Sequence, residues 1–144
     1  MIPAFNKDGN LSEGIHRISQ PDLLNYFGSS SSRRKWLGER LKELLDLAKA
    51  TGKVERIFVW GSFVTAKDSP NDLDVFLVVG DGFNEETLDS YDALFDYAKA
   101  RMRFCADVFW ARISSGEDAI KSLLDAYQNT RDFKRRGIVE VIFE

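Results

Sequence analysis

Two aspartates separated by one residue, Asp72 and Asp74, open an otherwise apolar stretch that runs to Val79. Side chains alternate across a β-strand, so both carboxylates point to one face, with β-carbons about 6.6 Å apart. Left alone, such neighbours repel and one stays protonated. A hard cation such as Mg²⁺ or Mn²⁺ removes that cost, because it takes carboxylate oxygens and completes its shell with water and phosphate oxygens. The pair therefore predicts a metal site that binds phosphates.

A third aspartate and a Gly-Ser pair stand in positions that suit the same chemistry. Asp107 interrupts the apolar run from Phe104 to Trp110, where an acid is costly unless it is paired, hydrogen-bonded or metal-bound. Gly61 permits close backbone approach, and Ser62, which follows it, would begin a helical turn whose amides face phosphate oxygens. The structural alternative is that each aspartate is a turn former or the partner of a nearby cation.

Alternating helices and strands are expected to position these residues. The apolar spacing predicts helices over 33–49 and 85–102, the latter burying Leu88, Tyr91, Phe95, Ala98 and Met102, and a third helix that opens with a Ser115–Asp118 capping box and runs through Tyr127. Strands are expected at 57–60, 72–79, 104–110 and 138–143. Residues 1–30 are interpreted as an N-terminal arm with one short helix. The pattern predicts an α/β (α+β) domain whose helices cover a small mixed sheet of about four strands.

The whole chain sets limits on this chemistry. Its 144 residues, 44% hydrophobic, are enough for a single domain spanning 1–144. One cysteine, Cys105, and one histidine, His16, exclude a disulfide framework and two-histidine zinc motifs. The net charge of −3 gives no global basic field for nucleic acid. Without a long apolar run or an apolar leader, we expect a cytoplasmic protein that does not enter membranes.

The order of these motifs resembles the DNA polymerase β-type nucleotidyltransferase superfamily. Val59-Trp60-Gly61-Ser62, a nine-residue spacer and Asp72-Leu73-Asp74-Val75-Phe76-Leu77 are similar to its signature, and Asp107 stands where the family has a third carboxylate. The resemblance implies a minimal nucleotidyltransferase fold. It also implies Mg²⁺-dependent transfer of a nucleoside monophosphate from an NTP, with ATP the expected donor, to a hydroxyl of a protein, an RNA or a small molecule. The implied residues are Asp72, Asp74 and Asp107 for catalysis and metal, and Gly61, Ser62 and Lys67 for phosphates.

A closer resemblance, to a little-characterised group of small bacterial proteins in that superfamily, rests on Ile2–Phe5, Gly14–His16, Gly61–Thr65 and Pro70–Asp72. The chain also departs from the superfamily, since Phe63–Lys67 replaces a common Ala-Arg-Gly and little sequence remains for a helical substrate domain. Substrate capture would then need a partner chain, a homodimer or the N-terminal arm. The alternative is a noncatalytic module that binds a nucleotide or a partner, for example half of a toxin–antitoxin or phage-defence pair.

Two basic segments have open interpretations. Arg131, Lys134, Arg135 and Arg136 either guide a polyanionic acceptor or keep the surface soluble. The run Arg33–Lys35 opposes the dipole at a helix N-terminus, a local conflict that a bound anion would relieve.

Overall fold

A five-stranded mixed sheet forms the centre of the computed structural model, which describes residues 2–84 and 91–143. The strands are β1 (Ile15–Ser19), β2 (Val54–Trp60), β3 (Leu73–Val79), β4 (Ala106–Arg112) and β5 (Ile138–Ile142), in the order β1-β5-β2-β3-β4. The β1–β5 and β3–β4 pairs are parallel, and the other two pairs are antiparallel. The predicted α/β (α+β) class, with helices flanking a small mixed sheet, is confirmed.

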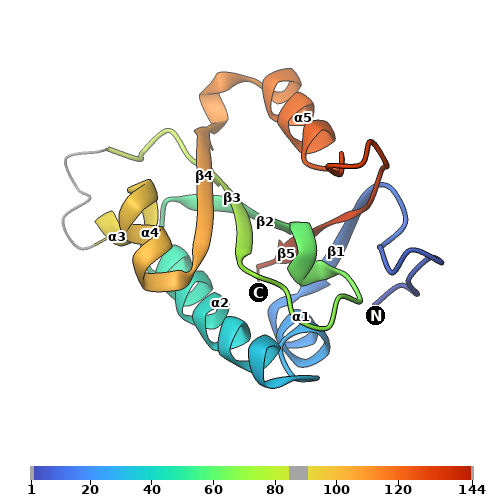
Figure 1. Ribbon diagram of the computed structural model, residues 1–144. Helices are drawn as coiled ribbons and strands as arrows, with labels where there is room; N and C mark the ends of the chain where they lie inside the picture. Colours follow the sequence, from blue (N-terminus) through green and yellow to red (C-terminus); the bar gives the residue numbers. More distant parts are fainter. Residues whose placement is uncertain (1, 85–90, 144) are drawn as a thin grey trace.

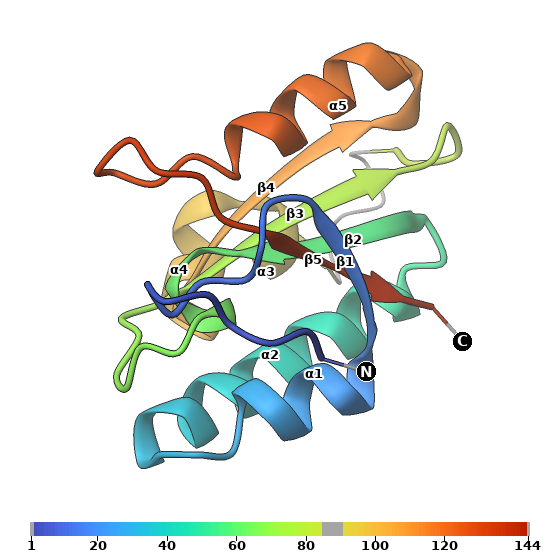
Figure 2. The ribbon, with the colours of Figure 1, turned by 90° about the vertical axis from the view of Figure 1, so that its right-hand side faces the viewer.

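Helices lie on both faces of this sheet. Figures 1 and 2 show α1 and α2 on one side and α5 on the other, with α3 and α4 beside β4. Their bounds, with those of two short 3₁₀ segments, are α1 Gln20–Phe27, α2 Ser32–Ala50, η1 Gly61–Val64, α3 Asp92–Phe95, α4 Tyr97–Phe104, η3 Ile113–Ser115 and α5 Glu117–Ala126. Over the described residues, no helix combines the length and apolarity that a membrane crossing requires.

The main core lies between the sheet and α2. The side chains of Leu73, Val75 and Leu77 alternate onto this face of β3 and are fully buried. Opposite them, α2 buries an apolar stripe at helical spacing, which includes Leu37, Leu41, Leu44, Leu45 and Ala48. The helix begins at Ser32, one residue before the predicted start, and the Ser31 side chain caps it by accepting a hydrogen bond from the Arg34 amide at 3.1 Å.

A smaller core lies on the opposite face, beneath α5. Phe76 and Val78 of β3 pack there with Phe58 of β2 and with Ile120 and Leu124 of α5. The predicted alternation of β3 is thus confirmed, since its even-numbered side chains face α5 and its odd-numbered ones face α2. This second cluster begins at Phe76, so the start of the strand, with Asp74, lies outside it.

The N-terminal arm contains a strand that the sequence did not predict. Residues Ile15–Ser19 pair in parallel with β5, and Ile18 is buried in the main core. The sheet therefore has five strands rather than about four, and only the short helix expected within 1–30 is confirmed, as α1. The sequence does not predict this strand because its two apolar residues, Ile15 and Ile18, are three positions apart and do not alternate.

The helix predicted over 85–102 is divided in its described part into α3 and α4, so the prediction of one continuous helix is wrong. Residues 85–90, with Leu88, lie outside the described residues. Asp96 is extended and caps α4, accepting a hydrogen bond from the Lys99 amide, so α3 and α4 are separate helices. The cap also rotates the face that is buried: Met102 is 87% exposed, whereas Ala100 and Phe104 are buried.

Other predicted boundaries are also wrong: β2 begins at Val54 rather than at 57, and β4 ends at Arg112 rather than at 110. The strand expected from Phe104 begins two residues later, because Phe104 ends α4 and Cys105 follows in the left-handed conformation with φ of 53°. The capping box at Ser115 is absent, since Ser115 belongs to η3 and Gly116 caps α5 without a side-chain bond.

Candidate active site

Two neighbouring strands, β3 and β4, bring the predicted acidic residues together. Asp74 on β3 lies in register with Asp107 on β4 and with Trp60 on β2. Their alternation places these side chains on the α5 face, just beyond the small core. Asp72 precedes β3 and lines the same end of the sheet. The strand pairing thus gathers carboxylates that lie far apart in the sequence.

Gly61 forms the seat of the Asp74 carboxylate. Its φ of +79° lies in the left-handed region, and a β-carbon added there would collide with Oδ2 of Asp74. The sequence predicts that phosphate oxygens approach the backbone at this glycine. In the structure it is the carboxylate itself that packs against the backbone where β2 passes into η1.

The electrostatic state of Asp74 is unusual. Burial, and then the negative charges of Asp72 and Asp107, raise the pKa of Asp74 to about 7, although Arg136 and Arg101 oppose the shift. Ionised Asp74 is therefore disfavoured by its surroundings at neutral pH. Any additional cation beside it would relieve that repulsion.

Two side chains of α4 bind the flanking acids. Nη1 of Arg101 lies 3.1 Å from Oδ2 of Asp72 and 3.4 Å from Oδ1 of Asp107. The Tyr97 hydroxyl donates a hydrogen bond to the same Oδ1 of Asp107 at 2.7 Å. Sequence reasoning missed both residues. Their i, i+4 spacing on the helix directly before Asp107 is the signal that was present in the sequence.

A pocket of about 610 Å³ opens beside the acids. Asp72, Asp74, Ser62 and Lys67 line it, so four of the six predicted site residues share one hollow. Gly61 and Asp107 are not among its lining residues. Gly61 lies behind the Asp74 carboxylate. Asp107 is bound by Tyr97 and Arg101 of α4. The other walls come from the N-terminal arm, the loop between β2 and β3 and the segment before β5, through Asp8, Gly9, Asn10, Thr65, Ala66, Asn71, Thr130, Arg131, Asp132 and Arg136.

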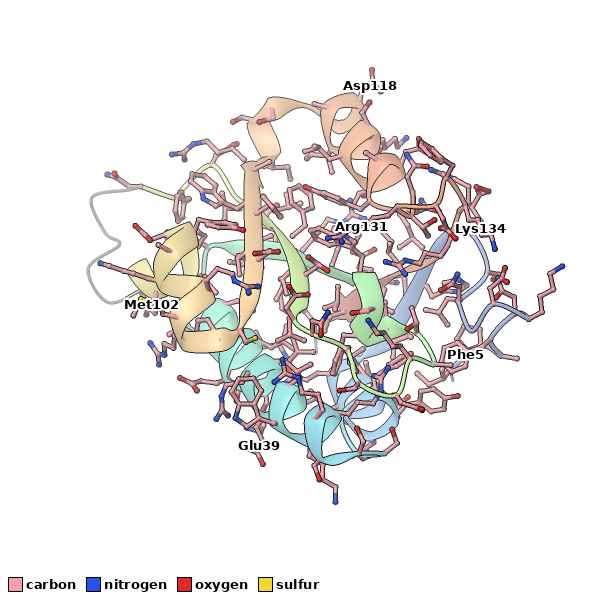
Figure 3. All side chains as sticks on the ribbon, viewed as in Figure 1. Phe5, Glu39, Met102, Asp118, Arg131 and Lys134 are labelled. Carbon is pink, nitrogen blue, oxygen red and sulfur yellow. The ribbon has the colours of Figure 1, made fainter. Side chains whose placement is uncertain are left out.

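The basic cluster divides between surface and pocket. Arg135 pairs with Glu13 and Asp125, each at 2.6 Å, and Lys134 lies within 4 Å of acids, so these two are structural. Figure 3 shows Lys134 near the edge of the molecule and Arg131 nearer its centre. Arg131 and Arg136 line the pocket.

A family model matches residues 3–142, which is almost the whole chain. The chain belongs to DUF6932, a family of unknown function. Comparisons with curated proteins and with solved structures find no match. The function of this DUF6932 protein is therefore inferred from the chemistry of its own residues.

Arg136 is the pocket cation best placed to meet an anion. Burial lowers the pKa of its guanidinium, and Asp74 and Asp132 are the nearby charges that oppose this shift. Its Nε is buried and has no hydrogen-bond partner among the described residues. A buried donor of this kind costs free energy until an acceptor reaches it. The pocket wall therefore includes a cation with one unsatisfied buried donor, close to the acidic cluster.

Arg34 holds the segment between Gly61 and Asp72 in place. Its side chain is 3% exposed and donates hydrogen bonds to the carbonyl oxygens of Phe27, Phe63, Thr65 and Lys67. Arg33 continues the pattern with Pro70 and Asn71. The expected conflict with the helix dipole is thus relieved by loop carbonyls rather than by a bound anion. These bonds fix the pocket wall that carries Lys67.

The donor chemistry of the site fits a hard cation, but the site is not arranged for one as it stands. Within residues 2–84 and 91–143, no three His, Cys, Asp or Glu side chains form a ready metal cluster. Arg101 instead neutralises Asp72 and Asp107 together. Asp74, with a raised pKa, is the acid whose charge is least compensated. Asp72 and Asp74 are the residues that would hold Mg²⁺ or Mn²⁺, joined by Asp107 when Arg101 is displaced.

Proposed function

We propose that this protein is a metal-dependent nucleotidyltransferase that moves a nucleoside monophosphate from an NTP to a hydroxyl of a protein, an RNA or a small molecule. One observation carries the proposal: the Asp74 carboxylate is seated against Gly61 with a raised pKa, flanked by two further acids, at the wall of a pocket that also presents cations. A metal–triphosphate complex bound in this pocket would reduce the repulsion between the neighbouring carboxylates.

The pocket residues have distinct roles in this proposal. Ser62, Lys67 and Arg136 bind the phosphate chain, because they line the hollow and supply donors and positive charge. Asp72 and Asp74 hold the metal, which when bound neutralises phosphate charge and lowers the pKa of the acceptor hydroxyl. Asp107 takes the acceptor's proton. ATP is the first donor to test.

The acceptor must come from outside the small sheet. The N-terminal segment Asp8–Asn10 already forms part of the pocket wall, which supports a contribution of the arm to substrate capture. A partner chain or a second copy of this chain would supply the rest of the acceptor-binding surface. Since NTPs are metabolites of the cytoplasm, the proposal implies that location.

A second candidate function is a noncatalytic module that binds a nucleotide or a partner, such as half of a toxin–antitoxin or phage-defence pair. The observation that favours it is Arg101, whose guanidinium already compensates Asp72 and Asp107 without a metal. If this ion pair is permanent, the two carboxylates need no metal ion to compensate their charge.

Melting of the full chain with ATP, with and without Mg²⁺ or Mn²⁺, separates the two functions. We expect ATP and metal together to raise the melting temperature more than ATP or metal alone, because ligands that bind only the folded state stabilise it. The substitution Asp74→Asn should abolish this gain. Asp118→Asn, on the exposed first turn of α5, is the matched control and should retain it.

Transfer is then tested with α-labelled NTPs against extracted protein and RNA. Label on a macromolecule together with released pyrophosphate supports the enzyme. Stabilisation by ATP that is independent of metal and of Asp74, with no label transferred, would leave the noncatalytic module as the function.

A further inference from the structure

The order of strands separates two sides of the site. Gly61 and Ser62 follow β2, Asp74 lies on β3 between β2 and β4, and Asp107 lies on the edge strand β4. The proposed phosphate-binding residues Ser62 and Lys67 are therefore on the β2 side of Asp74. The β4 side, with Asp107, is left for the group that attacks the nucleotide.

A hydroxyl of the protein already stands on that side. The Tyr97 hydroxyl donates to Oδ1 of Asp107 at 2.7 Å, the geometry that a general base needs to receive a proton. Tyr97 is 54% exposed, so its phenol is accessible from solvent although the hydroxyl is held. Arg101 reaches the same Oδ1 from the next turn of α4. Among the described residues, Tyr97 is the only hydroxyl side chain that the structure shows bonded to one of the three acids.

We propose that Tyr97 is itself an acceptor, so that the protein attaches a nucleoside monophosphate to its own α4. This inference rests on the proposed function. The phenolic oxygen of Tyr97 attacks the α-phosphorus of a bound NTP, and a new O–P bond forms. The bond between the α-phosphorus and its bridging oxygen breaks, pyrophosphate leaves with the electron pair, and the phenolic proton passes to Asp107. Tyrosine is among the residues known to serve as protein nucleophiles.

The modification would also change the contacts of Arg101. The product is a phosphodiester anion on a side chain that shares Oδ1 of Asp107 with this arginine. Arginine binds phosphate oxygens in preference to many other acceptors. Nucleotidylylated Tyr97 would therefore compete with Asp72 and Asp107 for the guanidinium.

The test uses the full chain, each of the four NTPs labelled at the α-phosphate, and Mg²⁺ or Mn²⁺. We expect a mass increase of one nucleoside monophosphate per chain, mapped by peptide mass spectrometry to Tyr97. The variant Tyr97→Phe should lose the label, because the attacking oxygen is removed while the ring that packs near Phe109 is kept. Tyr26→Phe is the matched control, since Tyr26 is 47% exposed on α1, and it should be labelled as the wild type is.

The outcomes separate this inference from the function on which it rests. Label that persists in Tyr97→Phe, or a wild type that shows the metal-dependent melting response but no label with any NTP, overturns the inference and leaves the transferase intact. A wild type with neither response overturns both, with the failure located at nucleotide binding. Label at Tyr97 that disappears in Asp74→Asn establishes the inference and ties it to the same site.

Discussion

The two faces of the sheet differ in what they do. The face toward α2 is closed: Val75 and Leu77 are fully buried in a continuous apolar core. The face toward α5 is closed only over Phe76 and Val78, and its other end carries Asp74 and Asp107 beside an open pocket. A single strand, β3, contributes to both. One face of the strand thus provides stability, while the start of its other face is free to hold groups that cost stability.

The loss of stability at the open end comes from its charged groups. Three acids gather at the open end, and their neighbours raise the pKa of one of them. On the closed side the one buried charge, Arg34, is satisfied by four carbonyl groups within the described structure. A charge that is fully hydrogen-bonded fixes a conformation, whereas Asp74 is an acid whose negative charge its neighbours compensate only in part. We interpret the difference as the division between scaffold and site.

The largest effect on stability should come from removing Arg34, whose hydrogen bonds join α2 to the pocket wall. Arg34→Met removes the donors that hold the carbonyls of Phe63, Thr65 and Lys67, and leaves these acceptors unsatisfied. We expect the free energy of unfolding to fall by about 3–5 kcal/mol, because each buried carbonyl left without a donor costs about 1–3 kcal/mol. Denaturant titration measures it. Lys35→Met, at the exposed next position, should change the unfolding free energy by less than about 0.5 kcal/mol.

The two faces should also differ when each loses a large apolar side chain. Leu77→Ala opens a cavity in the closed core and should cost about 2–4 kcal/mol. Phe109→Ala, on the α5 face of β4, should cost clearly less, because Phe109 is 42% exposed and part of its ring area is already in water. Chemical denaturation of both variants provides the comparison. Equal losses would contradict the division between scaffold and site.

The sequence predicts the acids because their cost is local. Asp72, Asp74 and Asp107 each interrupt or open an apolar run. A carboxylate in such a run costs free energy unless it is paired, hydrogen-bonded or metal-bound, and this cost can be recognised from the adjacent residues alone. Gly61 is predictable for the same kind of reason, as a glycine at a strand end. The division of β3 between two faces comes from alternation alone. These features depend on neighbours within a few positions in the chain.

The features that the sequence does not predict depend on distant partners. The partner of β1 is β5, near the other end of the chain, so the arm gave no local sign of pairing. Arg34 resembles an ordinary polar residue in the first turn of a helix until the loop carbonyls surround it. Tyr97 and Arg101 reach the site only because Asp96 separates α3 from α4 and starts α4 in a new direction. Tertiary contacts decided each of these.

The charge imbalance at the open end should make stability depend on pH in a particular direction. Unfolded Asp74 has a pKa of about 3.9, and the folded value is raised to about 7. Between these values the folded state binds more protons, so the contribution of Asp74 to the unfolding free energy falls as pH rises from about 4 to about 7. Asp74→Asn should therefore stabilise the metal-free protein, by about 2 kcal/mol more at pH 8 than at pH 5.

Denaturant titration in the presence of a chelator measures this difference. Asp118→Asn, which removes an exposed acid on α5, is the control for the loss of one carboxylate. A gain from Asp74→Asn that is the same at both pH values would mean that the carboxylate is ionised without cost, and the contrast between the two faces would lose its electrostatic basis.

The smallest effect on stability should come from a residue that belongs to the pocket alone. The backbone carbonyl of Lys67 is held by Arg34, whereas its side chain is exposed at the pocket wall. Lys67→Ala should therefore change the unfolding free energy by less than about 0.5 kcal/mol. If Lys67 binds phosphates, the same change should weaken ATP binding in the presence of metal by about tenfold, or about 1.4 kcal/mol. Calorimetric titration measures the affinity, with Lys121→Ala on α5 as the control. If Lys67→Ala lowers the unfolding free energy but leaves the affinity for ATP unchanged, the Lys67 side chain supports the fold and does not bind phosphates.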